Sequence, residues 1–369
     1  MSEAAGERDL HLRHGSIHAP AFLPDGTVGV VRAVDAADLT HLGIQGVVMS
    51  TFHLMQNPGA GTIAALGGLH AMTGWGGPII TDSGGFQAYS VVRQQPKRGS
   101  VTDEGIRYRP AGRKRKFLLT PEKAIQLQVD FGADIAICLD EPTHVDDSMD
   151  IQRSAVARTV AWARRCRTAF DQQMQHIKLG SETAPKLFAV VQGGGSKELR
   201  RHCAEQLLDI GFDGFGYGGW PLDRSGKLLT DMLAFTRELI PQQFPMHALG
   251  VGHPENIEIG VQLGYQIFDS ALPTRDARRG RLYSFTHDSQ LEGEWFKFIY
   301  IEDERHRKDT RPVCEHCDCA TQRYSRGYLH HLFHLGDHAY FRLATLHNLC
   351  FMRRLEERLA NRLSPFGIG

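Results

Sequence analysis

The sequence lacks the long apolar runs and the excess of one charge that mark several classes of protein. No uninterrupted apolar stretch approaches the roughly 20 residues that a membrane-spanning helix needs, so we expect no membrane segment. The 42 basic and 42 acidic residues cancel, which excludes a global positive field as the means of binding nucleic acid. The acidic, polar residues 1–9 are unlike a secretory signal, and the chain contains no internal repeat and no low-complexity segment.

Cysteines are also few, and they do not form a disulfide framework. Four of the seven stand alone, whereas Cys314, Cys317 and Cys319 lie together beside His316. Scattered single cysteines with one cluster are typical of a reducing compartment and of one metal site. We therefore expect a cytoplasmic protein.

What the sequence does contain is a regular alternation of short apolar runs with helical patterns. The 369 residues, 41% of them hydrophobic and 23% charged, suit one large globular domain or two ordinary ones. The apolar runs cover residues 46–50, 78–81, 133–139, 186–191, 213–217, 246–249 and 265–268. Amphipathic stretches lie between them at 120–128, 150–170 and 196–208, and the first begins with a capping threonine followed by proline. Strands that alternate with helices predict βαβ units and a parallel sheet.

The ends of the apolar runs indicate which parallel sheet this is. Nearly every run ends in a polar, acidic or glycine-rich residue. In a (β/α)8 barrel the carboxyl ends of the strands form the catalytic face, whereas a doubly wound sheet needs only one glycine-rich switch point. The pattern therefore favours an α/β fold of the TIM-barrel type over a doubly wound sheet.

Two segments interrupt this alternation. Residues 92–117 predict a small two-stranded β insertion with an exposed basic run at 113–116. Residues 292–311 are charged and lead into helical pieces at 324–351 that are rich in His, Leu and aromatic residues. We expect a catalytic barrel over residues 1–290 and a C-terminal module over 291–369 that packs on it.

The stretch 267–275, Ile-Phe-Asp-Ser-Ala-Leu-Pro-Thr-Arg, holds the strongest chemical signal. Asp269 follows a short apolar run, and Arg275, Arg278, Arg279 and Arg281 come directly after it. An acid at the end of a buried strand beside positive charges suggests an active site that faces a polyanion. The alternative interpretation is an aspartate that caps the next helix.

Asp82 and Asp140 also follow apolar runs, so three carboxylates are expected on one face of the barrel. Converging carboxylates can divide the roles of nucleophile and acid/base. The glycines at 84–85 and 218–219 allow a close approach to a planar ligand, Phe86 can stack on a ring, and Gln192 can pair with a heterocycle edge. Each residue alone also has an ordinary explanation as a helix cap, a turn or a core side chain.

On these residues the chain resembles the tRNA-guanine transglycosylase (queuine tRNA-ribosyltransferase) family from about residue 15 to residue 359. The most specific motifs are Thr-Asp-Ser-Gly-Gly-Phe-Gln at 81–87 and Phe-Asp-Ser-Ala-Leu-Pro-Thr-Arg at 268–275. Segments at 21–24, 52–54, 66–70, 191–194 and 324–332 also look like family segments in family order.

The resemblance implies a (β/α)8 barrel that exchanges guanine at the wobble position of a tRNA anticodon for a 7-deazaguanine base. Asp269 matches the nucleophile that attacks the ribose C1′, and Asp82 matches the acid/base residue. Such an exchange needs a carboxylate that traps a cation-like ribose and a target base that leaves its stack. Phe86 and Leu249 match the pair that sandwiches the base, and Arg275 and Arg278 match residues that contact the anticodon loop. The positions that match base-recognition residues are Ser83, Asp140, Gln192, Gly218 and Gly219. Basic patches at 113–116 and 275–281 would hold the RNA backbone.

The resemblance also implies a structural zinc, but the ligand pattern departs from that of the family. The family has Cys-x-Cys, two further residues, a third Cys and a His about 25 positions on, and Gln322 stands where the third Cys is expected. Cys314 can complete a set of three thiolates and one imidazole, and His316 is a weaker candidate. The alternative is a loop of reduced, metal-free cysteines. The expected zinc ligands are Cys314, Cys317, Cys319 and His347.

The base pocket departs as well. Bacterial members have a small aliphatic run closed by a glutamate after the two glycines, whereas this chain has Trp220, Pro221, Leu222, Asp223 and Arg224. Pro142 also replaces a typical cysteine. Because an arginine in place of the glutamate disfavours a cationic substituent, our hypothesis is that the substrate is not simply the aminomethyl precursor. The cyano precursor and queuine both remain open.

Two other functions are compatible with the resemblance. A non-catalytic tRNA-binding subunit of a heteromeric transglycosylase would tend to lose the nucleophile, yet Asp82 and Asp269 are both present. The same base exchange on DNA is opposed by the segment 324–332, which looks like that of the tRNA branch. A barrel enzyme of sugar-phosphate chemistry unrelated to RNA is opposed by the order of the motifs. The family commonly forms homodimers through the zinc-side region, so the helices at 324–351 are an expected contact surface.

Overall fold

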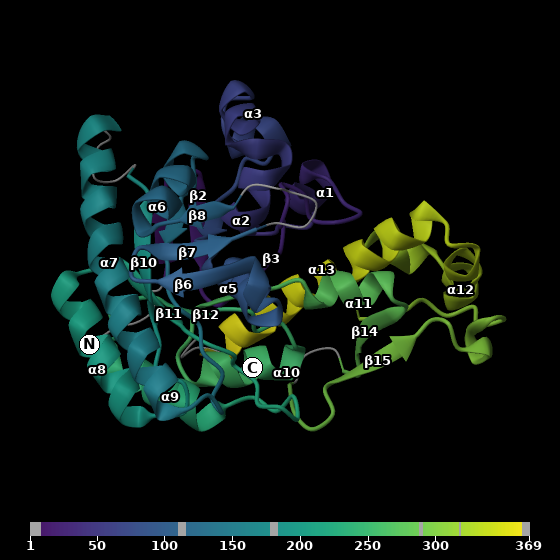
Figure 1. Ribbon diagram of the computed structural model, residues 1–369. Coiled ribbons are helices and arrows are strands. Elements are labelled where there is room, and N and C mark those ends of the chain that lie inside the picture. The colour runs from purple at the N-terminus through teal and green to yellow at the C-terminus, as the bar shows by residue number, and fades with distance from the viewer. Residues whose placement is uncertain (1–8, 110–115, 178–183, 288–290, 317–318, 364–369) are drawn as a thin grey trace, which may run out of the picture.

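The computed structural model describes residues 9–109, 116–177, 184–287, 291–316 and 319–363. Its centre is a sheet of eight parallel strands (Figure 1). In chain order the strands are β3 (Ala21–Pro24), β4 (Val47–Ser50), β5 (Ile79–Asp82), β9 (Ile135–Ile137), β10 (Lys186–Val191), β11 (Gly214–Tyr217), β12 (Met246–Ala248) and β13 (Ile267–Ser270). Their order across the sheet is β3-β13-β12-β11-β10-β9-β5-β4, and a parallel bridge between Asp25 and Val48 joins the two outer strands. The predicted TIM barrel is therefore confirmed.

The strands form because their apolar residues are buried on both faces. In β10, Phe188 and Val190 join the cluster that fills the barrel, whereas Leu187, Ala189 and Val191 join the larger cluster under the helices. This alternation follows from the two-residue period of a strand. The hairpin of β1 (Asp9–Leu12) and β2 (Gly15–His18) adds side chains to the inner cluster at the amino ends of the strands.

Helices surround the barrel, and α7 and α8 lie side by side on its outer wall (Figure 1). The predicted start of α6 is confirmed, since the Thr120 side chain accepts a hydrogen bond from the backbone N–H of Lys123. Among the described residues, no helix combines the length and the apolar character that crossing a bilayer requires. The helices of the barrel are α1 (Ala36–His41), α2 (Thr51–Leu54), α3 (Ala60–Ala65), α4 (Leu69–Thr73), α5 (Gly85–Gln94), α6 (Pro121–Asp130), α7 (Met149–Ile177), α8 (Lys197–Ile210), α9 (Thr230–Leu239), α10 (Pro254–Gln262) and α11 (Leu272–Arg278).

The insertion after α5 has three strands, so the prediction of two was wrong. Strands β6 (Gly99–Thr102), β7 (Gly105–Tyr108) and β8 (Phe117–Leu119) form an antiparallel sheet. Strand β8 was missed because its three residues directly precede the cap of α6. Of the predicted basic run, Lys116 is exposed, and residues 113–115 lie outside the described residues.

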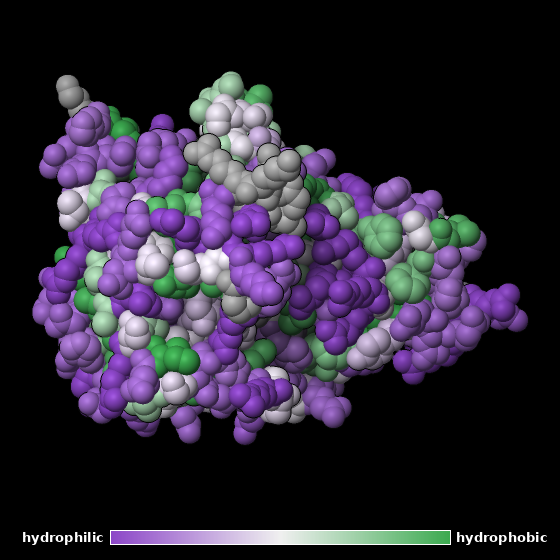
Figure 2. All heavy atoms as spheres, viewed as in Figure 1, coloured by the Kyte–Doolittle hydropathy of each residue, from purple (hydrophilic) through white to green (hydrophobic). Residues whose placement is uncertain are grey.

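The C-terminal elements project from one side of the barrel (Figure 1). They begin with an antiparallel hairpin of β14 (Arg281–Phe285) and β15 (Phe296–Tyr300), which lies partly in the stretch predicted to be only a charged connection. Helices α12 (Arg326–Leu335) and α13 (His338–Leu363) follow. Hydrophilic side chains cover most of the face in Figure 2, and the hydrophobic ones form small separate groups.

Helix α13 returns to the barrel and packs on the seam between β3 and β4. The Glu356 carboxyl group accepts hydrogen bonds from the backbone N–H of Phe22 in β3 and from Gln45 Nε2, which lies 3.2 Å away. Burial raises the pKa of Glu356 to about 8. The two outer strands share only a short bridge, so this side chain provides β3 with an additional partner at the seam.

Candidate active site

Asp269 lies near the end of β13 with one carboxylate oxygen fixed and the other open. Its Oδ1 accepts hydrogen bonds from His247 Nε2 at 2.8 Å and from the backbone N–H of Gly250 at 3.0 Å. Among the described residues no donor reaches Oδ2. The side chain is 16% exposed, so a ligand at the rim can reach the open oxygen. This is the geometry that a carboxylate nucleophile requires.

His247 was not found by sequence reasoning. It lies in β12, its side chain is fully buried, and its Nδ1 has no partner among the described residues. Because a carboxylate oxygen accepts the hydrogen bond, the imidazole donates it from Nε2. A single histidine in the apolar run Met-His-Ala carries no motif that would reveal this contact.

Asp82 ends β5 and is held by three donors. Oδ1 accepts from the backbone N–H groups of Thr51 at 3.1 Å and Gly84 at 2.9 Å, and Oδ2 accepts from Gln87 Nε2 at 2.8 Å. Burial raises the pKa of Asp82 to about 7, although the hydrogen bonds from Gln87 and Gly84 lower it. A carboxyl group that titrates near neutrality is suited to give and take protons. Gly84 is required there, because its φ is +77° and a Cβ would lie 2.9 Å from the backbone nitrogen of Phe52.

Asp25 is a fourth carboxylate at this rim, in addition to Asp82, Asp140 and Asp269, and it was also missed. It follows β3, its carboxylate accepts a hydrogen bond from the backbone N–H of Thr27 at 2.7 Å, and burial raises its pKa. The charge of Asp269 raises the pKa of Asp25, and the charge of Asp25 in turn raises that of Asp82. Asp25 therefore connects the two predicted catalytic carboxylates electrostatically. The apolar run at 21–23 was the signal that could have revealed it, had it been interpreted as a strand.

The predicted base-recognition residues of β9, β10 and β11 come together. Gln192 Nε2 donates to Asp140 Oδ2 at 2.6 Å, and Gln192 Oε1 is buried without a partner among the described residues. Burial raises the pKa of Asp140 to about 6. A Cβ at Gly218 would lie 2.6 Å from Gln192 Nε2, and one at Gly219 would lie 2.8 Å from the carbonyl oxygen of Thr143. The glycines therefore leave room for a flat ligand whose donor can meet Gln192 Oε1.

Arg200 fixes this pocket from behind and was not predicted. Its guanidinium is buried and donates to the carbonyl oxygens of Gly194 at 2.9 Å, Val191 at 3.1 Å and Gly218 at 3.2 Å. It also lies 4.1 Å from the centroid of the Tyr217 ring. Arg200 thus ties the end of β10 to the end of β11.

The three remaining predicted base-binding residues differ in how deeply they are buried; they are Ser83, Phe86 and Leu249. Ser83 is buried and its Oγ accepts from the backbone N–H of Gly85 at 3.2 Å. Phe86 is 44% exposed, as a stacking surface must be, and its ring lies 4.9 Å from that of Trp220 at an angle of 51°. Leu249 is half-buried just after β12. Trp220 therefore contributes an aromatic ring that the family comparison did not assign to the site.

Arg224 lies at the surface, where its side chain is 79% exposed and its Nε lies 2.6 Å from Asp146 Oδ2. Its positive charge is thus paired with a carboxylate. The hypothesis that the substrate is not simply the aminomethyl precursor stays a prediction.

The basic cluster beside Asp269 differs from the predicted one. Burial lowers the pKa of Arg278, and the nearby charges of Arg32, Arg275 and Arg279 lower it further. Arg281 is not one of these mutually repelling arginines, because its charge is paired with that of Asp276 at 2.6 Å. Guanidinium groups that repel one another favour an anion between them, such as a phosphate.

The cysteine cluster contains a histidine arranged like a metal ligand. His347 Nε2 lies 2.6 Å from the carbonyl oxygen of Tyr283, to which it donates, and Nδ1 faces Cys319 Sγ at 3.4 Å. Metal-bound histidines commonly donate their second nitrogen to a carbonyl in this way. Cys314 is buried and near enough to His347 to interact with it electrostatically, whereas Cys317 lies outside the described residues. Cys319 and His347 are of the ligand types that hold structural zinc, and a bound ion would supply a structural cross-link there.

One cysteine of this cluster was not predicted. The pKa of the Cys319 thiol is lowered, first by a hydrogen bond from the Cys350 thiol and then by the charge of His347. Gln322 is exposed, and its Nε2 donates to the carbonyl oxygen of Glu315 at 3.4 Å. Cys350 therefore contacts the cluster, and the side chain of Gln322 is directed elsewhere.

Other polar groups lie away from the barrel rim. His14, His70 and Asp134 could hold a metal near the amino ends of the strands, and Glu304, His330 and His334 could do so in the C-terminal part.

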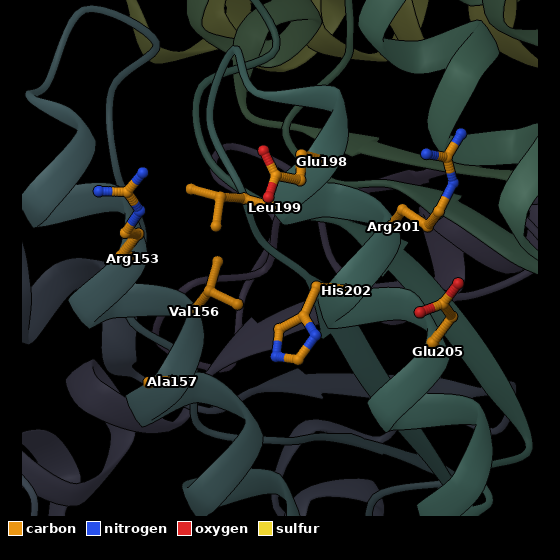
Figure 3. Close-up of a pocket in the computed structure, with 8 residues that line it drawn as sticks. All are labelled: Arg153, Val156, Ala157, Glu198, Leu199, Arg201, His202 and Glu205. Carbon is orange, nitrogen blue, oxygen red and sulfur yellow. The ribbon is translucent and has the colours of Figure 1, made fainter.

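A cavity of about 450 Å³ between α7 and α8 lies on the outer wall (Figure 3). Its lining residues are Arg153, Val156, Ala157, Glu198, Leu199, Arg201, His202 and Glu205. None of these eight belongs to a strand end.

A closed parallel barrel with carboxylates held at one rim defines a (β/α)8-barrel enzyme that works at the carboxyl ends of its strands. The family model described as queuine tRNA-ribosyltransferase matches residues 5–364. The chain belongs to this family, and it is accordingly a pentosyltransferase.

Individual relatives agree with this assignment along almost the whole chain. The chain is 36% identical to the queuine tRNA-ribosyltransferase of Mannheimia succiniciproducens over 93% of its length and 85% of that relative. It is 38% identical to the enzyme of that name from Nitrosomonas europaea, over 94% of this chain and 87% of the relative. For the Solidesulfovibrio magneticus relative the identity is 36%, over 95% and 88%.

Proposed function

We propose that the protein exchanges guanine in a tRNA anticodon for a 7-deazaguanine base through a covalent bond between Asp269 and the ribose. The observation that carries this proposal is the open Oδ2 of Asp269 at the same rim as Asp82, whose pKa is about 7. One carboxylate is available for attack, and the other can exchange a proton at neutral pH.

The reaction follows from these two groups. Asp269 Oδ2 attacks C1′ of the ribose, the bond from C1′ to guanine N9 breaks, and the leaving guanine takes a proton from Asp82. The incoming base then gives its N9 proton to Asp82 and attacks C1′, which breaks the ester bond and frees Asp269. The two displacements are those of a retaining glycosidase.

The pocket around Gln192 supplies base recognition. Its buried Oε1 accepts from a donor on the base edge, and the Asp140 carboxyl group next to it completes a polar edge. Phe86 offers an exposed ring to one face of the base, and Leu249 is proposed for the other. Extrusion of the base from its stack costs a few kcal/mol, which these contacts would offset.

The surface beside Asp269 is proposed to bind the anticodon loop. Arg275 and Arg278 lie on α11, directly after the nucleophile, and Arg32 and Arg279 add charge to the same place. We also propose a homodimer that forms through α12, on which Tyr328 is 43% and Leu335 is 64% exposed.

The test is a base-exchange assay on a transcribed anticodon stem-loop with labelled guanine, both precursor bases and queuine as competitors. We expect wobble guanine to exchange, and we expect a stem-loop with adenine at that position to remain unlabelled. A DNA stem-loop of the same sequence distinguishes RNA from DNA substrates. Absence of exchange on every stem-loop would contradict the proposal.

His247 is proposed to position the nucleophile. Replacing it with leucine removes the donor to Asp269 Oδ1, so we expect kcat to fall about 100-fold while KM for the RNA changes little. A His247→Gln variant keeps an amide donor and should recover part of kcat. Steady-state kinetics on the stem-loop measures both constants. Equal losses in the two variants would show that His247 only fills space.

A further inference from the structure

Helix α12 carries two histidines one turn apart, His330 and His334, and Glu304 of the 3₁₀ helix η3 (Glu304–His306) lies beside them. One potential ligand atom from each of the three side chains lies within 4.8 Å of the other two. Residues four positions apart lie on the same face of a helix. The group belongs to the C-terminal part that projects from the barrel, and it is not at the rim that holds Asp269 (Figure 1).

His330 is oriented as a metal ligand would be. The residue is buried, with 5% of its surface exposed, and its Nδ1 donates to the carbonyl oxygen of Ile301 at 2.8 Å. The lone pair of Nε2 is therefore free in the neutral ring. Nε2 has no partner among the described residues and is accessible from the surface. Histidines that bind metal usually donate their other nitrogen to a carbonyl or carboxylate group in this way.

His334 and Glu304 are available to complete the group. The rings of His330 and His334 meet edge to face, with centroids 4.3 Å apart and planes at 63°, so their nitrogens can converge on one point. His334 is exposed and makes no hydrogen bond among the described residues. The Glu304 side chain is 75% exposed, and its ion pair with Arg307 is long, at 3.9 Å. Such a surface pair contributes little free energy, so an ion can displace it.

A second group of two histidines and a carboxylate, at the amino ends of the strands, shows the contrast. His14 Nδ1 lies 2.8 Å from Asp134 Oδ1, and His70 Nε2 lies 3.4 Å from Asp134 Oδ2. The two rings stack with centroids 3.6 Å apart and planes at only 24°. Nearly parallel rings direct their lone pairs along parallel lines, and the carboxylate already engages both nitrogens. That group is satisfied by its own hydrogen bonds, whereas the group on α12 is not.

The simpler explanation is that these residues form an ordinary solvated helix face. It accounts for His334 and Glu304, which are exposed. It does not account for His330, because a buried imidazole is fixed there by a carbonyl group with its second nitrogen left accessible beside another imidazole.

We propose that Glu304, His330 and His334 bind a divalent transition metal such as zinc. Two imidazoles and one carboxylate are ligands that zinc accepts, whereas Mg²⁺ and Ca²⁺ prefer oxygen ligands alone. Three protein ligands leave one tetrahedral position for water. The bound ion ties η3 to α12. The site is separate from the cysteine cluster, and it does not depend on the proposed base exchange.

The experiment titrates Co²⁺ into wild type, His334→Ala, Glu304→Gln and the matched control His331→Ala. His331 is an exposed histidine of the same helix that is not part of the group. Nitrogen and oxygen ligands give visible ligand-field bands without the charge-transfer band that thiolates add. We expect wild type and the control to bind equally. We expect the other two variants to bind more weakly by at least the roughly 10-fold that loss of an outer-shell partner already costs.

A second measurement uses wild type alone, in case a variant does not fold. Diethyl pyrocarbonate acylates accessible imidazoles, and peptide mapping locates the product. Zn²⁺ should protect His334 and leave His331 reactive, and a chelator should restore the reactivity of His334. The site would be overturned by equal Co²⁺ affinity in His334→Ala and wild type, by an equal loss in His331→Ala, or by acylation of His334 that is insensitive to Zn²⁺. Base exchange on the same preparations tests the proposed function separately.

Discussion

Replacing Asp269 with asparagine is expected to slow base exchange by at least about 10⁴-fold, the scale of loss when a nucleophile is removed. The amide oxygen can still accept the hydrogen bonds from His247 and Gly250, so the barrel should keep its stability. An amide cannot form the ester with C1′, so the covalent intermediate is lost along with the rate. Incorporation of labelled guanine measures the rate, and a denaturing gel of the protein with labelled stem-loop detects the covalent complex.

The control is Asp231→Asn, which removes an exposed carboxylate on α9. This variant should exchange bases and form the covalent complex at the wild-type rate. If Asp269→Asn still gave a gel-stable complex, the nucleophile would have to be another group at the rim, and Asp25 would be the first to test because its charge interacts with that of Asp269.

Replacing Asp82 with asparagine is expected to lower the exchange rate by about 10²- to 10⁴-fold, the range of a general acid/base contribution. The pH dependence identifies the cause. Asp82 must be ionised to take the N9 proton, so the wild-type rate for the second step should rise as the pH passes through about 7. The asparagine variant should lack this rise of the rate with pH, which we call the ascending limb of the pH profile. Single-turnover rates between pH 5 and pH 9, in steps of about 0.5, measure it.

The pKa of Asp140, in the same pocket, is about 6. The ascending limb of the pH profile therefore has to be assigned either to Asp82 or to Asp140. Asp25→Asn removes a charge that raises the pKa of Asp82 and should move the limb to lower pH without abolishing it. A limb that stays at the same pH in Asp25→Asn and persists in Asp82→Asn would assign it to another group.

Local sequence patterns were sufficient for most of the barrel. Seven of the eight strands appear as apolar runs of the sequence, since a strand buried on both faces must be apolar throughout. Strand β3 was missed because it ends in Pro24 and follows Pro20, and prolines are more typical of turns than of central strands. The hairpin of β14 and β15 was missed for a different reason. The segment between 292 and 311 is charged overall, and this conceals the largely apolar five-residue run that forms β15.

The candidate site was predictable where a residue lies at, or shortly after, the carboxyl end of its strand. Asp82, Asp140 and Asp269 were found in this way, because parallel strands end at one edge. His247, Arg200 and Cys350 could not be found in this way. Each is an isolated residue in an apolar or helical stretch, and it was revealed only by a contact with a residue 6 to 31 positions away along the chain.

The contact between Glu356 and Phe22 joins the last helix of the chain to the first strand of the barrel. Strand β3, which carries Phe22, pairs with β13 in the register that places Leu23 beside Asp269. During synthesis on the ribosome, the strand next to Asp269 is therefore made long before Glu356, which is one of its final partners. A nascent chain that already contains all eight strands still lacks the contact between Glu356 and Phe22. We therefore expect catalytic activity to appear only when translation is nearly complete.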